Sequence, residues 1–471
     1  MRIIGNDPDV PRQTQGVASG TMTNGKPVIV NSDGTVSVVS GSSASIGTAA
    51  VFESANMGDD IDAVFDSTNN KVVIAYRDIG DSNYGKAVVG TVSGSSISFG
   101  SPVTFNSGGY TGDIGIGFDA NAGKVLIGYR NNGNSNYGTA IVGTVSGTSI
   151  SFGTAAVFYS TQAQDIAFAY DSTAQKLVVC YRNDGSPAKG SANVCTISGT
   201  SVSFGSQADF EGAAVGYVSA TYDSNSNRIL VAYSDEGNSN YGTACVGTVS
   251  GTSISFGSAT VFEDSNTLRI STTFDSNLNK IVISYRNGTD SDKGKAVVGT
   301  VSGTSISFGT PVVFNDAQTD TNGIVFNPDT NKVTIAYRDT GNSGHGTVID
   351  GTVSGTSISF ESENVFEAAS TDPVGGVVYD TSNDKTVIIF RNDSSGNREG
   401  EALTYVGGST NITSENYIGI SRSGAADTKG AIINTQGAIA DNLSGLTAGQ
   451  SYFVQTDGTL GTTADDPSVF A

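Results

Sequence analysis

One stretch of sequence recurs along most of this chain. A tyrosine near its middle, replaced by phenylalanine in the last copy, marks each occurrence: Tyr76, Tyr129, Tyr181, Tyr233, Tyr285, Tyr337 and Phe390. Successive copies are 53, 52, 52, 52, 52 and 53 residues apart. A period of this length with almost no drift is typical of repeat architectures, in which each copy is one supersecondary unit.

Each copy contains four short runs in which apolar and polar residues alternate. In the second copy these runs, named A to D in chain order, cover residues 113–119, 124–130, 139–145 and 149–158. Turn-forming residues separate the runs, and none of them has helical periodicity. Seven copies of four antiparallel strands predict an all-β chain that folds as a seven-bladed β-propeller with four-stranded blades.

Small residues within the runs indicate where each strand lies. Run A carries pairs such as Gly115 with Gly117 and Ala167 with Ala169. Small side chains suit the innermost strand, where the blades converge on the axis, and we place run A there. Run C has a recurrent glycine, Gly143 in the second copy, which predicts a bulge or a close approach of backbones.

The two ends of the repeated region complement each other. The region begins with a lone D-like run at 45–52 and ends with A, B and C runs at 374–380, 385–391 and 401–406. We therefore predict that the N-terminal run supplies the fourth strand of the seventh blade. This pairing closes a ring, whereas a linear stack would leave sheet edges exposed. Residues 411–417 are the alternative source of the seventh D run.

The repeat boundaries predict three parts. Residues 1–44 form an N-terminal arm, with a β-hairpin turn at Asp33-Gly34. Residues 45–408 form the propeller, and residues 409–471 form a small C-terminal β-rich module with a turn signal at Asp457-Gly458. We expect the arm to serve attachment or docking.

Charge and hydropathy exclude several classes of function. The chain has 45 acidic and 24 basic residues, a formal charge of −21. Such a surface repels nucleic acids and anionic membranes, although it is compatible with weak capture of cations such as calcium. No stretch reaches about 18 apolar residues, so we expect no membrane insertion. The first ten residues lack the apolar core of a secretory signal.

The chain has three cysteines, Cys180, Cys195 and Cys245. An odd number in a long chain is not a disulfide framework, and we expect buried free thiols. The alternative is that Cys180 and Cys195 face each other across one predicted hairpin.

The connections between runs differ in how faithfully they recur. In an up-and-down blade, the A–B and C–D turns lie on one face, and the B–C turns and D-to-A crossings lie on the other. The C–D turn barely changes (SGSS or SGTS), whereas the crossing differs in every copy, as in NSGGYTGD and EDSNTL. Because a binding site needs individual residues, we place it on the variable face.

The B–C turns supply the candidate ligand-binding residues. In each turn one residue directly precedes a recurrent glycine, and these residues are Tyr84, Tyr137, Lys189, Tyr241, Lys293, His345 and, in the last copy, Glu399. Tyrosines can stack on the apolar face of a sugar, and nearby polar groups can bind its hydroxyls. The alternative, to which we give more weight, is that these residues only cap the hairpins.

Asp60, Asp113 and Asp165 start run A in three successive copies and could form an acidic rim that attracts a cation. They are weak candidates, because no segment has the ligand spacing of a calcium loop. His345 is the only histidine, which excludes a His-rich metal site and leaves no basis for triad catalysis. We therefore assign no catalytic residue and no cofactor, and we expect no enzyme.

Two polar positions recur too regularly to be catalytic. One is the arginine after the marker tyrosine: Arg77, Arg130, Arg182, Arg286, Arg338 and Arg391, with Ser234 in the fourth copy. The other is the acid of the A–B turn: Asp66, Asp119, Asp171, Asp223, Asp275 and Asp380. We interpret both as scaffold, the arginine as a partner of carboxylates or turn carbonyls and the acid as an Asx turn.

Three parts of the sequence together resemble a known family. They are the arm GTMTNGKPVIVNSDGTVSVVSG, the units YRDxGNSNYGxAxVGTVSGTSISFG and the terminal LSGLTAGQSYFVQTDGTLGTT. They are similar to tail-fibre and other virion appendage proteins of marine bacteriophages, particularly those that infect cyanobacteria. The resemblance implies a non-enzymatic virion protein, assembled in the host cytoplasm and released by lysis.

The resemblance also implies partners. The arm or the C-terminal module would dock on other virion proteins, and the propeller would bind a host-surface polysaccharide. A purely architectural virion protein, such as a capsid decoration or a fibre spacer, is the alternative. A secreted lectin or a glycan-cleaving enzyme ranks below both, and a homo-oligomer is left open.

Overall fold

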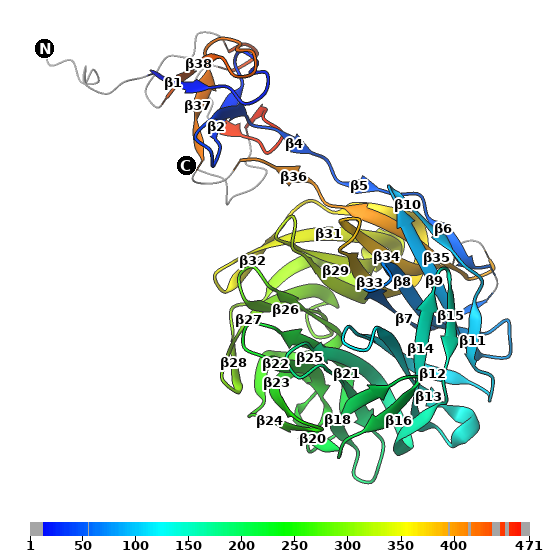
Figure 1. The fold of residues 1–471 in the computed structure, drawn as a ribbon. Coiled ribbons are helices and arrows are strands. Elements are labelled where there is room, and N and C mark those ends of the chain that lie inside the picture. Colours follow the sequence, from blue (N-terminus) through cyan, green and yellow to red (C-terminus); the bar gives the residue numbers. More distant parts are fainter. Residues whose placement is uncertain are drawn as a thin grey trace, which may run out of the picture. The chain divides into compact units, whose positions relative to one another are not determined.

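The computed structural model describes residues 13–54, 56–393, 396–412, 416–435, 443–447 and 452–462. Antiparallel strands dominate, and the described helices are three short 3-10 turns: η1 (Asn132–Asn134), η2 (Glu236–Asn238) and η3 (Thr340–Asn342). None of the described helices is long and apolar enough to cross a membrane. The chain divides into two compact units, one of residues 46–406 and one of residues 1–45 with 407–471 (Figure 1).

The terminal unit is built from both ends of the chain. Its five-stranded sheet has the order β1 (Gln13–Val17), β38 (Gly430–Asn434), β37 (Tyr417–Ser421), β2 (Pro27–Val30) and β3 (Val36–Val38). Two further pairs are β4 (Gly41–Ser42) with β36 (Ser409–Thr410) and β39 (Phe453–Val454) with β40 (Leu460–Gly461). The predicted turns at Asp33-Gly34 and Asp457-Gly458 both connect paired strands.

This arrangement differs from the division into an arm at 1–44 and a separate module at 409–471. In the structure the two segments share one sheet, since β2 pairs with β37 and β1 with β38. Pairing between strands about 400 residues apart leaves no local pattern in the sequence. The two segments therefore form one compact unit.

The repeated region consists of seven repeats, each with strands in four positions. A numbered unit or set, from first to seventh, is one of these repeats in chain order. Position A is occupied by β7 (Met57–Asp66), β12 (Thr111–Asp119), β21 (Val215–Asp223) and the second halves of β16 (Ala156–Asp171), β25 (Thr260–Asp275), β29 (Val312–Asn327) and β33 (Asn364–Asp380). Position B is occupied by β8 (Lys71–Asp78), β13 (Lys124–Asn131), β17 (Lys176–Asn183), β22 (Arg228–Asp235), β26 (Lys280–Asn287), β30 (Lys332–Asp339) and β34 (Lys385–Asn392).

Positions C and D complete each set. Position C is occupied by β9 (Tyr84–Ser93), β14 (Tyr137–Ser146), β18 (Lys189–Ser198), β23 (Tyr241–Ser250), β27 (Lys293–Ser302), β31 (His345–Ser354) and β35 (Glu399–Val406). Position D begins with β10 (Ser96–Phe99), β15 (Ser149–Phe152), β19 (Ser201–Phe204), β24 (Ser253–Phe256), β28 (Ser305–Phe308), β32 (Ser357–Phe360) and β5 (Ser45–Ile46). It continues in β11 (Val103–Asn106), β20 (Ala208–Glu211), β6 (Ala50–Glu53) and the first halves of the four long strands.

Run D was predicted as one strand, but a short break divides it in two. In the second copy the break lies between Phe152 and Ala156, and both pieces pair with β14. The second piece then continues as strand β16, which pairs with β17 in the next copy. Four of the crossings are therefore extended strands that serve two units, rather than irregular loops.

The strands at 45–53 belong to the seventh set. β35 is followed in the sheet by β5 and β6, and Gly400 and Ala402 lie opposite Glu53 and Ala50. Of the alternative source, residues 411–417, residues 413–415 lie outside the described structure, and Tyr417 begins β37, which pairs with β2. The N-terminal run thus takes the place that the sequence predicts for it.

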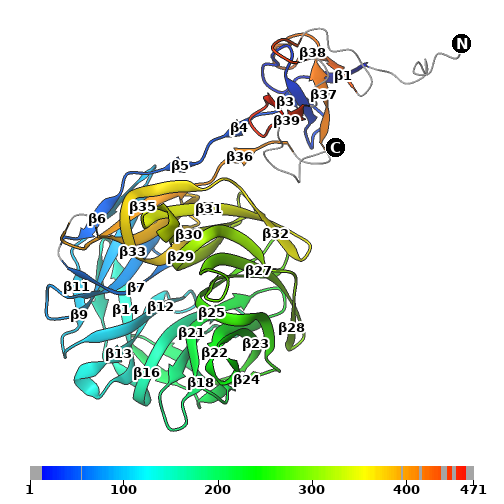
Figure 2. The ribbon, with the colours of Figure 1, turned by 180° about the vertical axis from the view of Figure 1, so that it is seen from behind.

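The A strands lie at the middle of the repeated region (Figures 1 and 2). Each contacts the A strands before and after it, and β7 contacts both β12 and β33. The hydrogen-bonded sheets themselves remain open. Small residues are required here, because a Cβ on Gly115 would lie 2.3 Å from the carbonyl oxygen of Ile166.

Aromatic rings join each unit to the next. The buried marker tyrosine contacts a phenylalanine from the preceding D strand, as Tyr181 contacts Phe158 with ring centroids 5.0 Å apart. The same pairing recurs in Phe52–Tyr76, Phe105–Tyr129, Phe210–Tyr233, Phe262–Tyr285, Phe314–Tyr337 and Phe366–Phe390. The glycine of the B–C turn makes room for this ring, since a Cβ on Gly138 would lie 2.5 Å from Phe158.

The uniform C–D turn also contacts its neighbour. A Cβ on Gly153, at the break in run D, would lie 1.9 Å from the carbonyl oxygen of Thr200 in the next C–D turn. The equivalent contacts are Gly47–Ser95, Gly100–Thr148, Gly205–Thr252, Gly257–Thr304 and Gly309–Thr356. The turn therefore recurs faithfully because every copy packs against the backbone of another unit.

The cysteines are buried and free, as predicted. Cys180 lies opposite Ala192 and Cys195 opposite Leu177, so these two thiols do not face each other across the strand pair.

Candidate functional site

Each A strand is bulged near its start. The pairing between positions A and B shifts register there, for example between Gly112 and Gly115. The bulged residue has a left-handed backbone in five units: Asp113 (φ 50°), Asp165 (47°), Tyr217 (53°), Arg269 (53°) and Thr321 (34°). Non-glycine residues adopt this conformation at a cost, and bulges of this kind re-aim a side chain.

We call these five residues, with their counterpart Asp60 in the first unit, the bulge ring. Five of the six share the left-handed backbone and Asp60 does not, and the side chains comprise three acids, a tyrosine, an arginine and a threonine. Because the A strands contact one another in succession, these side chains follow one another around the same end of the strands. The ring combines a repeated geometry with individual chemistry.

Three acids form one half of the ring. Asp60 and Asp113 each form an ion pair with the arginine of the same unit, Arg77 Nε and Arg130 Nε, at 2.8 Å. The backbone amide of Asp113 also donates to Asp60 at 2.7 Å, and that of Asp165 donates to Asp113 at 3.1 Å. The carboxylates thus connect successive units.

Burial raises the pKa values of two ring acids and of one acid near them. It raises the pKa of Asp113 to about 6, and burial with the nearby Asp113 charge raises the pKa of Asp165 to about 7. Burial also raises the pKa of Asp62 to about 7, although its carboxylate accepts the amide of Ile116 at 3.1 Å. Near neutral pH these groups hold protons for part of the time.

The structure gives the proposed cation ligands other partners. Asp60, Asp113 and Asp165 accept hydrogen bonds from backbone amides, and the first two are also paired with arginines. Across the described ranges, no group of three or more His, Cys, Asp or Glu side chains could hold a metal ion. The acidic rim is accounted for by contacts between units.

Two tyrosines lie beside arginines in this region. The guanidinium of Arg77 is 4.5 Å and that of Arg130 5.6 Å from the ring centroid of Tyr110, at the crossing into the second unit. Arg269 lies 5.7 Å from the ring centroid of Tyr217. Both tyrosines are half-buried. Aromatic rings next to charged groups offer a stacking surface with hydrogen-bonding groups at its edge.

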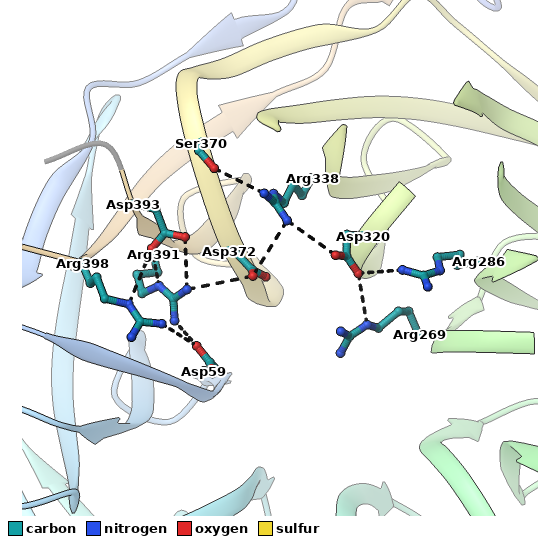
Figure 3. Close-up of polar contacts among 10 residues, drawn as sticks. All are labelled: Asp59, Arg269, Arg286, Asp320, Arg338, Ser370, Asp372, Arg391, Asp393 and Arg398. Atoms are coloured by element: carbon teal, nitrogen blue, oxygen red, sulfur yellow. Dashed lines mark hydrogen bonds and ion pairs between the residues drawn. The ribbon is translucent and has the colours of Figure 1, made fainter. Parts of the chain in front are cut away.

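A network of arginines and acids from the fifth, sixth and seventh units lies beside Arg269. Figure 3 shows one chain of polar contacts that runs from Arg398 and Arg391, through Asp372 and Arg338, to Asp320. Asp59 joins the chain through Arg391 and Arg398; burial raises its pKa, but the guanidinium groups of Arg391, Arg398 and Arg77 together outweigh burial and hold the pKa below its usual value.

Most recurrent arginines are held by carboxylates, which confirms the scaffold interpretation. Arg182 Nε pairs with Asp184 at 2.7 Å, and Arg286 with Asp292 at 3.0 Å. The A–B turn acids also behave as predicted, since Asp119 accepts the amides of Asn121 and Ala122 at 3.0 Å.

The predicted B–C residues occupy one equivalent place. Tyr84, Tyr137 and Tyr241 are the first residues of their C strands, and all three are half-buried. Each lies opposite the last residue of a B strand, for example Tyr137 opposite Asn131. No ring contact joins any two of them in the described structure. They are distributed one per unit rather than gathered.

The other B–C candidates include residues that bind protein groups. Lys189 Nζ pairs with Asp209 at 2.6 Å, and Lys293 Nζ pairs with Asp316 at 2.8 Å. His345 is half-buried and lies opposite Asp339. The two lysines are thus tied to acids of the neighbouring D strand or crossing.

The sequence did hold a signal for the residues that the prediction missed. Tyr217, Arg269 and Thr321 continue the series of Asp113 and Asp165 at intervals of 52 residues. The acidic pattern ends at Asp165, so a search for acidic residues alone does not reach the last three positions. Following the position instead of the residue type identifies the whole bulge ring.

No protein-family model and no curated protein matches the chain. Among solved structures, the chain resembles a lectin from Burkholderia pseudomallei with a TM-score of 0.56 and 10% identity, over 76% of this chain and 98% of that chain. A Dyadobacter fermentans protein of unknown function has a TM-score of 0.48 and 11% identity, over 77% of this chain and 98% of that one. A leech intramolecular trans-sialidase has a TM-score of 0.45 and 8% identity, over 75% and 68%. At these identities the likeness to the lectin shows an all-β fold of propeller type and nothing more.

Proposed function

We propose that residues 46–406 form a closed seven-bladed β-propeller that binds a glycan at the bulge ring. Closure is supported by the contacts of β7 with both β12 and β33, and by the contact of Phe52 from the seventh set with Tyr76 of the first. The pairing of β35 with β6 supports the same arrangement. Four strands in each of seven sets match a propeller blade.

The bulge ring carries the functional part of the proposal. It places Tyr217, Arg269, Asp113 and Asp165 on one repeated, left-handed backbone, while the C–D turns are nearly uniform. Tyrosine rings stack on the apolar faces of sugars, and arginine and carboxylate groups bind sugar hydroxyls. The likeness to a lectin supports a fold that is compatible with this role.

We further propose that the chain is part of a bacteriophage virion appendage that presents the propeller to a host-surface polysaccharide. The support is the resemblance of the arm, the units and the terminal segment to such proteins. In this proposal the terminal unit docks on other virion proteins, and the propeller binds without cleaving. Release of sugars from host envelope material by the purified protein would contradict binding without cleavage.

Affinity electrophoresis tests the glycan site. The purified protein is run through gels that contain envelope polysaccharides, and Tyr217→Asn is compared with the wild type. Asparagine tolerates the left-handed backbone, so the variant removes the ring without new strain. Loss of stacking should lower the affinity about tenfold. Unchanged binding by this variant, with binding lost in a Tyr84, Tyr137 and Tyr241 triple alanine variant, would move the site to the B–C turns.

One observation favours a second candidate, a purely architectural virion protein. Equivalent valines on the outermost strands are 40–48% exposed: Val51, Val157, Val261, Val313 and Val365. Exposed apolar residues at equivalent positions could contact other subunits. Electron microscopy of labelled particles separates the candidates, because a receptor-binding protein should present the bulge ring outward, whereas a spacer should bury it in a contact.

A further inference from the structure

We propose that the glycan bound at the bulge ring carries an acidic group, a carboxylate or a sulfate, and that Arg269 and Arg338 bind it. This inference rests on the proposed function and names the chemical class of its ligand. It follows from the residue that faces the recurrent arginine, which is an acid in the first two units but not in the fifth and sixth.

In the first and second units the bulge residue neutralises the arginine of the same unit. Arg77 pairs with Asp60 and Arg130 with Asp113, both through Nε at 2.8 Å. In the fifth unit the bulge residue is Arg269, and in the sixth it is Thr321. Arg286 and Arg338 therefore lack the acidic partner that the first two units provide.

One carboxylate is shared by three arginines as a result. Asp320 is 3.0 Å from Arg286 Nη1, 3.4 Å from Arg269 Nε and 3.5 Å from Arg338 Nη1 (Figure 3). A single carboxylate cannot neutralise three guanidinium groups. Arg286 has a second close partner, Asp292 at 3.0 Å, so the deficit falls on Arg269 and Arg338.

Arg338 is loosely held. Its other contacts are to Ser370 Oγ at 3.5 Å and Asp372 at 4.0 Å, all beyond the usual range of 2.7–3.2 Å for an N–H donor. Its Nε is buried and, unlike the Nε atoms of Arg77, Arg130 and Arg286, forms no ion pair within the described ranges. A buried guanidinium without a close acceptor costs free energy, which a bound anion would recover.

Arg269 is the more accessible of the two. Its side chain is 42% exposed, and among the described residues no hydrogen bond or ion pair reaches its terminal nitrogens. Its guanidinium lies beside Tyr217, 5.7 Å from the ring centroid. A sugar stacked on Tyr217 would therefore hold a carboxylate or sulfate within reach of an arginine fork.

The opposite half of the ring favours the same orientation. Asp113 and Asp165 are acidic, and the chain as a whole carries −21. The arginines of the fifth and sixth units therefore make that side of the ring more favourable for an acidic group than the side of Asp113 and Asp165.

Affinity electrophoresis with three probes tests the inference: polygalacturonate for carboxylate, dextran sulfate for sulfate and dextran as the neutral polymer. Three variants accompany the wild type. Arg269→Asn removes the guanidinium on a backbone that asparagine tolerates. Thr321→Asp supplies Arg338 with the partner that Asp113 gives Arg130. Arg228→Gln removes one half-buried arginine elsewhere, whose Nε donates to Gly303 O at 3.0 Å, and controls for net charge.

The wild type should bind one or both anionic polymers more tightly than dextran. Arg269→Asn and Thr321→Asp should each lower that affinity about ten- to a hundredfold, and Arg228→Gln should leave it within about twofold. The polymer that binds the protein more tightly shows whether the acidic group is a carboxylate or a sulfate. Equal binding of all three polymers, or of an envelope polysaccharide that is unaffected by Arg269→Asn, would overturn the inference and leave glycan binding intact. Binding to no polymer and to no envelope polysaccharide would instead refute the proposed function.

Discussion

The C–D turn and the bulge residue are both repeated positions, but the sequence of the turn varies much less than the identity of the bulge residue. The turn is nearly identical in each unit because Gly153 and its equivalents lie against the carbonyl of the next turn, at a distance no side chain permits. The bulge repeats its backbone at Asp113, Asp165, Tyr217 and Arg269, but not its side chain. The contacts of the faithful turn therefore hold units together, and the divergent residues of the bulge ring are available for binding.

This comparison leads to four predictions, ordered by their expected effect on stability. Substitutions at the positions that join units should lower the free energy of unfolding and leave glycan affinity per folded molecule unchanged. Replacement of Tyr217 in the bulge ring should instead lower glycan affinity and leave stability nearly unchanged, whereas Asp165, whose pKa is raised, should affect stability through its titration.

Gly153→Ala should have the largest effect on stability. Its new Cβ would lie 1.9 Å from Thr200 O, so the backbone of two units must shift, and we expect a loss of about 2–3 kcal/mol. Thermal and urea unfolding measure the loss. Gly212→Ala is the matched control, because nothing lies within 4 Å of its Cβ, and it should stay within about 0.5 kcal/mol. Equal stabilities of the two variants would contradict the contact between turns.

Tyr285→Phe removes a buried hydroxyl that donates to Glu263 at 2.7 Å. A hydrogen bond to a charged group contributes more than a neutral one, and we expect a loss of about 1.5–2 kcal/mol. Tyr181→Phe is the comparison, since its hydroxyl donates to the neutral amide of Asn193 at 2.9 Å, and it should cost about 1 kcal/mol. The reverse order in chemical unfolding would show that the carboxylate is not the stronger acceptor.

Asp165→Asn should change how stability depends on pH. The folded-state pKa of Asp165 is about 7, above its ordinary value of 3.8, so the folded protein binds more protons between these values. Its contribution therefore makes the free energy of unfolding fall as pH rises from about 4 to about 7. Asparagine does not titrate, so the variant lacks this pH-dependent loss of stability. Its side-chain oxygen can still accept a hydrogen bond from the amide of Tyr217.

As the pH rises from 5 to 8, the free energy of unfolding of the variant should increase by about 1–2 kcal/mol relative to that of the wild type. Differential scanning fluorimetry at both pH values measures the gain as a difference in melting temperature. A difference that stays constant with pH would mean that Asp165 titrates near its ordinary pKa.

Tyr217→Asn should have the smallest effect on stability. The tyrosine is half-buried, and its replacement relieves a left-handed backbone, so we expect a change within about 0.5 kcal/mol. Its glycan affinity should nevertheless fall about tenfold. A variant that loses stability and keeps its affinity would place Tyr217 in the scaffold and end the comparison.

Local periodicity explains what the sequence could predict. Alternation in runs such as 124–130 specifies a strand directly, and the D-like run at 45–52 matched its equivalents closely enough to be assigned to the seventh unit. The scaffold role of the recurrent arginines followed from repetition alone. The sheet shared by β2 and β37 was not predicted, because partners so far apart in the chain leave no periodic signal.

The bulge ring shows the other limit. A register shift such as that between Gly112 and Gly115 arises where an A strand meets both its own B strand and the next A strand. Alternation within a single run cannot reveal it. The sequence shows the acids Asp60, Asp113 and Asp165 as a series, but their roles depend on amides and arginines that only the fold brings together.

Hydrogen–deuterium exchange of the wild type, with and without the polysaccharide that it retains in affinity electrophoresis, tests the central claim most directly. The account predicts that the ligand slows exchange at the starts of the A strands, in peptides that include Asp113, Asp165, Tyr217 and Arg269. Exchange in the C–D turns, such as Ser146–Ser149, should not change. Protection confined to those turns, or to the B–C turns that contain Tyr84, Tyr137 and Tyr241, would contradict the claim that binding occurs at the bulge ring.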